Sequence, residues 1–156
     1  MPSTTKPTLA SVFEPMSRGN TTSWQYAEEK QVSFYISHTG TVTNKPFYHS
    51  EGPTIIRRVT FLPDTAVTSA SGEKWVVAFK TAGTNGLGTT ELADYTTYAS
   101  GSADINSALV ALDAEVIWEP SGGYECVDGQ VLYYDATETG TQVLAGLLIV
   151  SYVNII

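Results

Sequence analysis

From residue 31 onward, short stretches of alternating apolar and polar side chains are separated by turn-forming dipeptides. In the stretch 32–37, Val32, Phe34 and Ile36 occupy the even positions, and two of the three odd positions are serine. In the stretch 74–80, apolar residues at the odd positions stand between two lysines. Because successive side chains of a β-strand point to opposite faces, this period of two predicts half-buried strands.

The turn signals between these stretches indicate how the strands are connected. Asn85-Gly86 is the strongest short hairpin signal in the chain, and Asp128-Gly129 and Thr139-Gly140 mark further turns. Short strands with turns between them are typical of antiparallel sandwiches and barrels. No fixed repeat period appears, which argues against propellers and solenoids. We therefore predict an all-β fold, a jelly-roll-like antiparallel β-sandwich over residues 31–156.

Two segments of the C-terminal half deserve separate interpretation. The segment 105–118 has apolar residues at helical spacing, but 107–111 can also form a small-residue buried strand that leads into Val116, and we favour the strand. The segment 147–156 is apolar on both faces. A strand covered on both sides is expected in the middle of a sheet or beneath a neighbouring subunit, so we expect Ile149 to be buried.

Residues 1–30 differ from the rest of the chain. Three prolines lie among serines and threonines in the first twenty residues, and neither a helical nor a strand period is visible. We predict an extended N-terminal arm here, with a first strand of the chain's own sandwich as the alternative. The apolar and aromatic residues of the arm are the predicted partner-binding residues: Leu9, Val12, Phe13, Met16, Trp24 and Tyr26.

Charge excludes two classes of partner. The 156-residue chain has a formal net charge of −8, and its only adjacent basic pair, Arg57-Arg58, lies inside a probable strand. Nucleic-acid binding depends on clustered lysine and arginine that neutralise phosphates. Attraction to an anionic membrane surface depends on the same residues. We therefore expect neither a nucleic acid nor a membrane as partner.

The sequence contains no pattern that indicates catalysis or a cofactor. His49 and Glu51 would point the same way on a strand, and His38 could add a third metal ligand, but a solvated surface explains them better. Asp113 and Glu115 are spaced like a glycosidase pair with no second chemical group nearby. We predict no catalytic, metal or cofactor site, no cofactor and no enzymatic activity.

Aromatic residues are abundant, with nine tyrosines and three tryptophans. Tyrosine provides a large contact area at low cost in side-chain entropy, so it suits protein interfaces. The same rings stack on sugars, which leaves open a carbohydrate- or receptor-binding β-sandwich module of the kind found in phages. The remaining interpretation is that most of these rings are ordinary core and rim residues of a sandwich.

The layout of residues 53–156 resembles the jelly-roll decoration, or cement, proteins on the heads of tailed bacteriophages. The resemblance rests on the stretches 55–67, 74–82, 105–112 and 147–153, and on the element Val-Asp-Gly-Gln-Val-Leu at 127–132. It covers about two-thirds of the chain, and the 127–132 motif can occur in any sandwich. The family has no catalytic residues to carry over.

The resemblance implies a structural virion protein made in the host cytoplasm and located on the capsid surface. Such a subunit binds the major capsid protein on the outside of the lattice, bridges neighbouring capsomers and stabilises the head. It also implies a homo-oligomer, most often a trimer. No residue pattern in the sequence marks a trimer interface.

Overall fold

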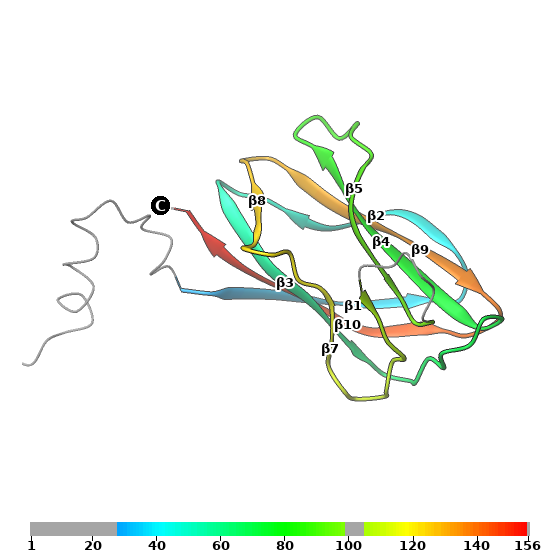
Figure 1. Ribbon diagram of the computed structural model, residues 1–156. Coiled ribbons are helices and arrows are strands. Elements are labelled where there is room, and N and C mark those ends of the chain that lie inside the picture. Colours follow the sequence, from blue (N-terminus) through cyan, green and yellow to red (C-terminus); the bar gives the residue numbers. More distant parts are fainter. Residues whose placement is uncertain (1–27, 99–104, 156) are drawn as a thin grey trace, which may run out of the picture.

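A computed structural model describes residues 28–98 and 105–155, which form two packed β-sheets (Figure 1). The strands of sheet A are β1 (Lys30–His38), β3 (Thr54–Pro63), β7 (Glu115–Trp118), β8 (Tyr124–Cys126) and β10 (Leu144–Asn154). The strands of sheet B are β2 (Val42–His49), β4 (Lys74–Gly83), β5 (Thr90–Thr96), β6 (Ile105–Asn106) and β9 (Val131–Thr139). The predicted all-β sandwich is confirmed. No helix of the described residues has the length and apolar character needed to cross a membrane.

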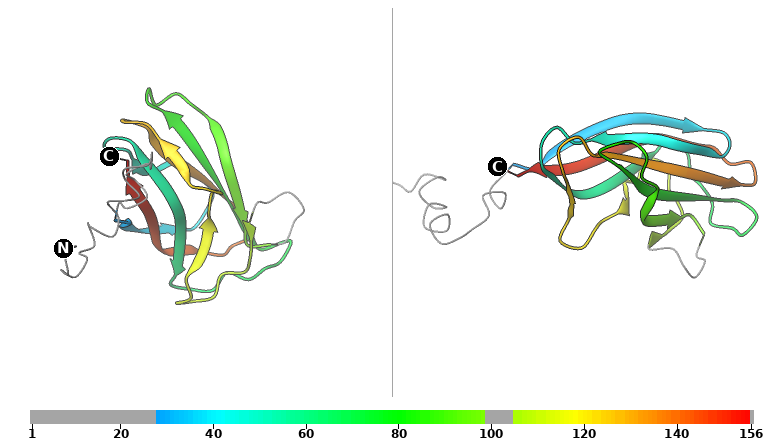
Figure 2. Two further views of the ribbon diagram at one scale, coloured as in Figure 1. Left: turned by 60° about the vertical axis from the view of Figure 1, so that its left-hand side comes forward. Right: turned by 90° about the horizontal axis from the view of Figure 1, so that it is seen from above.

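The order of strands is that of a jelly roll. Sheet A has the order β1-β10-β3-β7, with β8 also paired to β3, and sheet B has the order β2-β9-β4-β5-β6. The first and last strands of the sandwich are therefore neighbours, and the chain crosses repeatedly from one sheet to the other (Figure 2). Apart from β8 and β6, each five-stranded sheet has the four strands of a jelly roll in jelly-roll order. The two-residue β6 is an addition, and it pairs with β5 in parallel.

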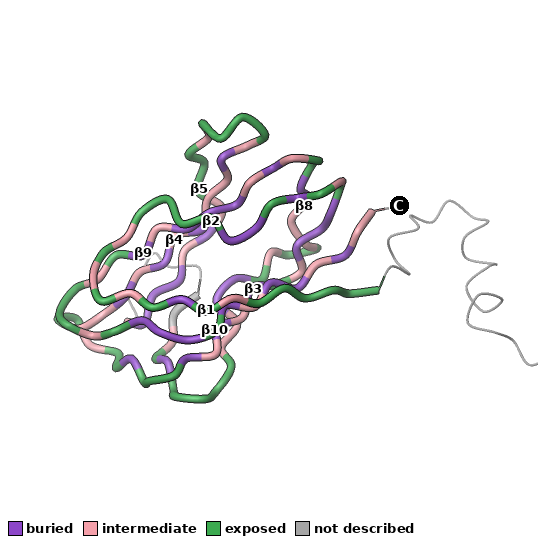
Figure 3. Tube along the Cα trace, turned by 180° about the vertical axis from the view of Figure 1, so that it is seen from behind, coloured by how far each residue is buried: buried purple, intermediate pink, exposed green. Residues whose placement is uncertain are grey.

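The core lies between the sheets and contains the inward side chains predicted from alternation. Figure 3 marks the buried residues in purple along the strands of both sheets. On β4, Trp75 and Phe79 are 0% exposed and Val77 is 5% exposed. On sheet A, Phe61 of β3 and Leu148 of β10 are each 2% exposed. Each such side chain contributes roughly 1.5–3 kcal/mol through burial, so the inner faces dominate the stability of the fold.

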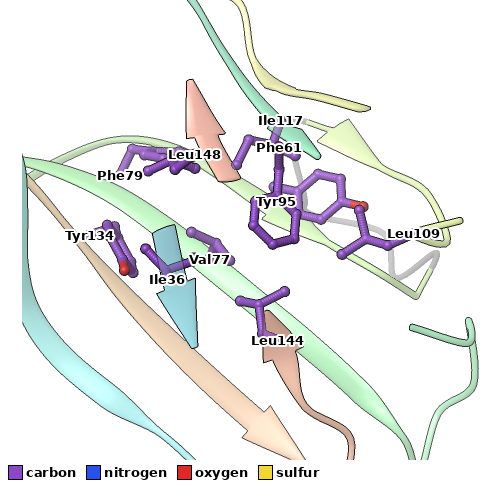
Figure 4. Close-up of a pocket in the computed structure, with 10 residues that line it drawn as sticks. All are labelled: Ile36, Phe61, Val77, Phe79, Tyr95, Leu109, Ile117, Tyr134, Leu144 and Leu148. Carbon is purple, nitrogen blue, oxygen red and sulfur yellow. The ribbon is translucent and has the colours of Figure 1, made fainter. Parts of the chain in front are cut away.

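A small void remains inside this core (Figure 4). It has a volume of about 10 Å³, which is no more than one water molecule needs. The surrounding side chains come from both sheets: Ile36, Phe61, Val77, Phe79, Tyr95, Leu109, Ile117, Tyr134, Leu144 and Leu148. An enclosed apolar space of this size is a packing defect of the sandwich, and we assign no ligand to it.

Two segments differ from the sequence-based prediction. The segment 105–118 contains no helix: β6 and β7 form its ends, and between them Leu109 makes an isolated bridge to Val67. The helix is therefore wrong, and the strand favoured for 107–111 is reduced to the bridge at Leu109, because the rest of that stretch is irregular. The strand β2 was not predicted, because Pro46 and two shifts of register interrupt its alternation. The predicted arm 1–30 lies almost wholly outside the described residues.

Candidate interaction surface

The outward side chains in the middle of sheet A form an uncharged surface. Cross-strand register places Tyr35 of β1 opposite Leu147 of β10, which lies opposite Leu62 of β3. The adjacent row runs from Ser33 through Ile149 and Thr60 to Val116 of β7. We call these seven residues the sheet A outer face. Tyr35 is 57% exposed and Leu147 37% exposed, and Leu62, Ile149, Thr60 and Val116 are half-buried.

Charged groups lie at the rim of this face. The Tyr35 hydroxyl donates a hydrogen bond of 2.8 Å to Oδ2 of Asp64, and this bond to the carboxylate is the main reason that the pKa of Tyr35 is raised. At the opposite end of the strands, Arg58 and Glu29 form an ion pair of 3.5 Å. The centre is apolar and hydroxylic, and the rim is polar, which is the arrangement found in protein–protein interfaces.

The outward side of sheet B is different, because it carries charges. Lys80 donates a hydrogen bond of 2.6 Å to Asp135, and the bond raises the pKa of Lys80. Partial burial alone would raise the pKa of Asp135, but the ammonium of Lys80 and the backbone N–H of Asn44 outweigh it and lower that pKa. Glu91 and Asp94 on β5 lie opposite Lys80 and Ala78. Sheet B therefore carries charged groups in the middle of its outward side, where the central rows of sheet A carry none.

The last strand explains why sheet A is apolar on its outer side. β10 lies between β1 and β3, which confirms the prediction of a central strand for 147–156. Its inward residues Leu148 and Val150 are 2% and 0% exposed. Ile149 points outward and is half-buried, so the described residues alone do not cover the second face of this strand. Within the described residues, Tyr35 and Leu147 of this outer face remain exposed.

The predicted partner-binding residues cannot be compared with this surface. Leu9, Val12, Phe13, Met16, Trp24 and Tyr26 all lie outside the described residues. The sequence pattern did not mark the sheet A outer face as a site. The sequence feature that could have identified it is the second apolar row of β10, formed by Leu147 and Ile149. This row predicts a covered second side of the strand, whereas in the structure it belongs to the outer face.

An open groove at the edge between the two sheets has the composition of a sugar site. It is lined by Trp118, Tyr124, Leu92 and Pro120 together with Glu91 and Glu119. Trp118, however, is 4% exposed, and its ring stacks on Phe79 with centroids 5.4 Å apart. The Tyr124 hydroxyl accepts a hydrogen bond from Gln130. Both tryptophans of the described region, Trp75 and Trp118, serve the core and offer no open ring face.

The residues that could carry chemistry are dispersed. Within 28–98 and 105–155, no group of three or more His, Cys, Asp or Glu side chains is placed to hold a metal ion. Cys126 is 1% exposed, and burial raises the pKa of its thiol to about 12. Such a thiol is neutral near pH 7 and is a poor nucleophile.

Comparisons with known proteins add little to this description. No family model and no curated protein matches the sequence. Among solved structures, one chain in the structure of infectious bursal disease virus, Gx strain, is similar, with a TM-score of 0.31 and 13% sequence identity. The match covers 82% of this chain and 30% of the viral chain, so this chain spans about a third of that one. The assignment of the fold rests on the strand order given above.

Proposed function

We propose that the protein is a non-enzymatic structural subunit of a virus particle, and that it binds the outside of the capsid lattice as a decoration, or cement, subunit. Its partner is the major capsid protein, and its place is the capsid surface. The single observation that carries the proposal is the sheet A outer face, an uncharged surface that spans four strands.

Leaving this apolar face in contact with water is unfavourable, and a bound protein would remove it from water. Leu62, Leu147, Ile149 and Val116 lie side by side in register on the outer side of the sheet, with Tyr35 next to them. A contiguous apolar patch with a polar rim on a soluble domain marks a binding site for protein or membrane. The net charge of −8 disfavours an anionic membrane, so a protein surface is the better partner.

The shape of the face favours a lattice over a small ligand. Small-molecule sites are concave and enclose most of the ligand. The void and the grooves described for this fold are lined by other residues than the seven of the sheet A outer face. A broad and rigid face, held by a core behind it, suits a subunit that reinforces a neighbouring protein. The resemblance to tailed-phage decoration proteins supports the same function, and the jelly-roll order of strands is consistent with it.

The test is co-sedimentation with undecorated capsids of the virus that encodes the protein. Leu147→Lys places a charge in the centre of the sheet A outer face, and Thr137→Lys places the same charge on the exposed side of β9 in sheet B. We expect Leu147→Lys to abolish binding and Thr137→Lys to bind like the unmodified protein. Equal binding of all three proteins would overturn the assignment of this face.

A glycan array distinguishes the alternative function of a carbohydrate-binding module. We expect no glycan to bind the unmodified protein. Specific binding to a glycan that Leu147→Lys leaves unchanged, together with no binding to capsids, would replace the structural function with a receptor-binding one.

A further inference from the structure

Among residues 28–98 and 105–155, no strand pairs with the outer edge of β1, which is long and regular. β1 is the terminal strand of sheet A, paired only with β10. Its nine residues keep one register with β10 from Lys30 to His38, without a bulge. Such an edge is about 30 Å long, and alternate residues direct their backbone N–H and C=O groups away from the sheet. Figure 3 shows how much of β1 is exposed.

The other sandwich edges in the described region are charged, short or irregular. β5 pairs with β6 only at its last two residues, and its free part carries Glu91 and Asp94. β8 has three residues. β2 contains Pro46, two register shifts and Asn44 at a φ of 54°. β7 is four residues long with a register shift beside it, and β6 has two residues. Proline, bulges and short length are the usual protection of edge strands. β1 has none of these, and the seven positions between Lys30 and His38 contain no charged residue.

We propose that β1 pairs antiparallel with β1 of a second copy of this chain, about a two-fold axis through Phe34, so that the two copies of sheet A become one continuous sheet. In this register Phe34 lies opposite Phe34 of the second copy, and Val32 lies opposite Ile36 of the second copy. On the outer side, Gln31 meets Ser37 and Ser33 meets Tyr35. Every pair joins residues from the same face of the sheet.

The choice of a second copy of this chain as the partner follows from this self-complementarity. A two-fold interface brings the same surface of both copies together, so each strand must match its own reverse. Inward residues Val32, Phe34 and Ile36 meet one another, and the outward pairs are uncharged. At the ends, Lys30 lies opposite His38 of the second copy. Burial, together with nearby Lys45, lowers the pKa of His38, so the imidazole is neutral near pH 7 and does not repel Lys30.

The contact also extends the surface that binds the partner. Tyr35, which lies in the sheet A outer face, would be adjacent to Ser33 of the second copy. The outer faces of both subunits would then form one larger surface. The inference goes beyond the proposed function, because it concerns the contact between two copies and holds whether or not the partner is a capsid. A two-fold contact closes as a dimer, in place of the trimer that the resemblance implies.

The first measurement is sedimentation of the full chain, without any capsid, from about 1 µM to about 1 mM. A single strand edge is smaller than a standard interface, so we expect a concentration-dependent equilibrium between monomer and dimer. A protein that remains monomeric over this range, or that forms a trimer without a dimer, would overturn the proposal.

The second measurement tests the register with two matched double variants. Gln31→Glu with Ser37→Glu places two pairs of like charges across the axis. Gln31→Lys with Ser37→Glu places two pairs of opposite charges there. Both variants remove the Gln31 amide that donates to Ser151, and the residues paired with positions 31 and 37 on β10, Ser151 and Ala145, are uncharged. Urea denaturation of the two variants at low concentration checks that their monomers are equally stable.

We expect the like-charged variant to be monomeric and the oppositely charged variant to dimerise at least as tightly as the unmodified protein. The dissociation constants should differ by roughly tenfold or more, because cross-strand charge pairs act directly on each other. Equal dimerisation of the two variants would show that the copies meet elsewhere. Because no capsid is present, failure of this test leaves the proposed function standing.

Discussion

Tyr35 and Leu147 lie directly opposite each other on β1 and β10, and both side chains point away from the core. They are 57% and 37% exposed, respectively. Leu148, the next residue along β10, points to the opposite side. It is 2% exposed and packs in the core. The same strand therefore stabilises the fold with one face and presents a binding surface with the other.

Lysine substitutions at these adjacent leucines should have opposite consequences. Leu148→Lys places an ammonium group among apolar side chains, and we expect a loss of more than about 4 kcal/mol or failure to fold. Leu147→Lys should change the free energy of unfolding by less than about 1 kcal/mol, because its amine reaches solvent. Urea denaturation measures both. Similar losses in the two variants would contradict the assignment of the faces of β10.

Gly146 is required for close approach between β10 and β3. A Cβ atom at this position would collide with the carbonyl oxygen of Leu62 and would lie 2.7 Å from Cα of Pro63. We expect Gly146→Ala to lower the free energy of unfolding by about 1–3 kcal/mol, the usual cost of overpacking. Gly72→Ala is the control, because no atom lies within 4 Å of a Cβ there. Thermal or chemical denaturation should separate the two variants, and equal stability would argue against this contact.

Cys126 should be protected from thiol reagents in the folded protein. The thiol is 1% exposed, and burial raises its pKa to about 12. We expect its reaction with an aromatic disulfide at pH 8 to be at least about a thousandfold slower than after unfolding in urea, because the thiolate is the reactive form. The absorbance of the released thiol measures the rate. Rapid labelling of the native protein would show that the region around β8 opens readily.

The pair formed by Lys80 and Asp135 should contribute to the pH dependence of stability. The folded-state pKa of Asp135 is lowered below its ordinary 3.8, so the unfolded chain takes up this proton at a higher pH than the folded chain. The stabilisation is present above pH 3.8 and is lost as the pH falls through the lowered folded value. The free energy of unfolding should therefore fall in acid, by a smaller amount in Asp135→Asn.

Lys80→Met provides a second comparison for the same pair. Without the ammonium group, only the backbone N–H of Asn44 opposes the effect of burial on Asp135. The pKa of Asp135 should therefore be higher than in the unmodified protein. Denaturation curves between pH 2 and pH 6 would show a smaller loss of stability on acidification than in the unmodified protein. An acid dependence identical to that of the unmodified protein would show that this ion pair is not maintained in solution.

The sequence by itself determined the fold class and many inward faces. Trp75, Val77 and Phe79 alternate with outward residues, and because the side-chain period of a strand is two, their common burial follows from local geometry. Turn pairs such as Asn85-Gly86 marked the β4–β5 hairpin for a similarly local reason. β2 was missed where Pro46 and irregular register removed the same local signal.

Tertiary structure alone decided which strands are neighbours and which apolar face remains open. Gln31 on β1 bonds to Ser151 on β10 across 120 residues of sequence, and no local pattern specifies such a partner. Leu147 and Leu148 are chemically the same residue, so only the position of sheet B, on one side of β10, makes one of them core and the other surface. Burial depends on what lies opposite a side chain, and that is set by packing between distant segments.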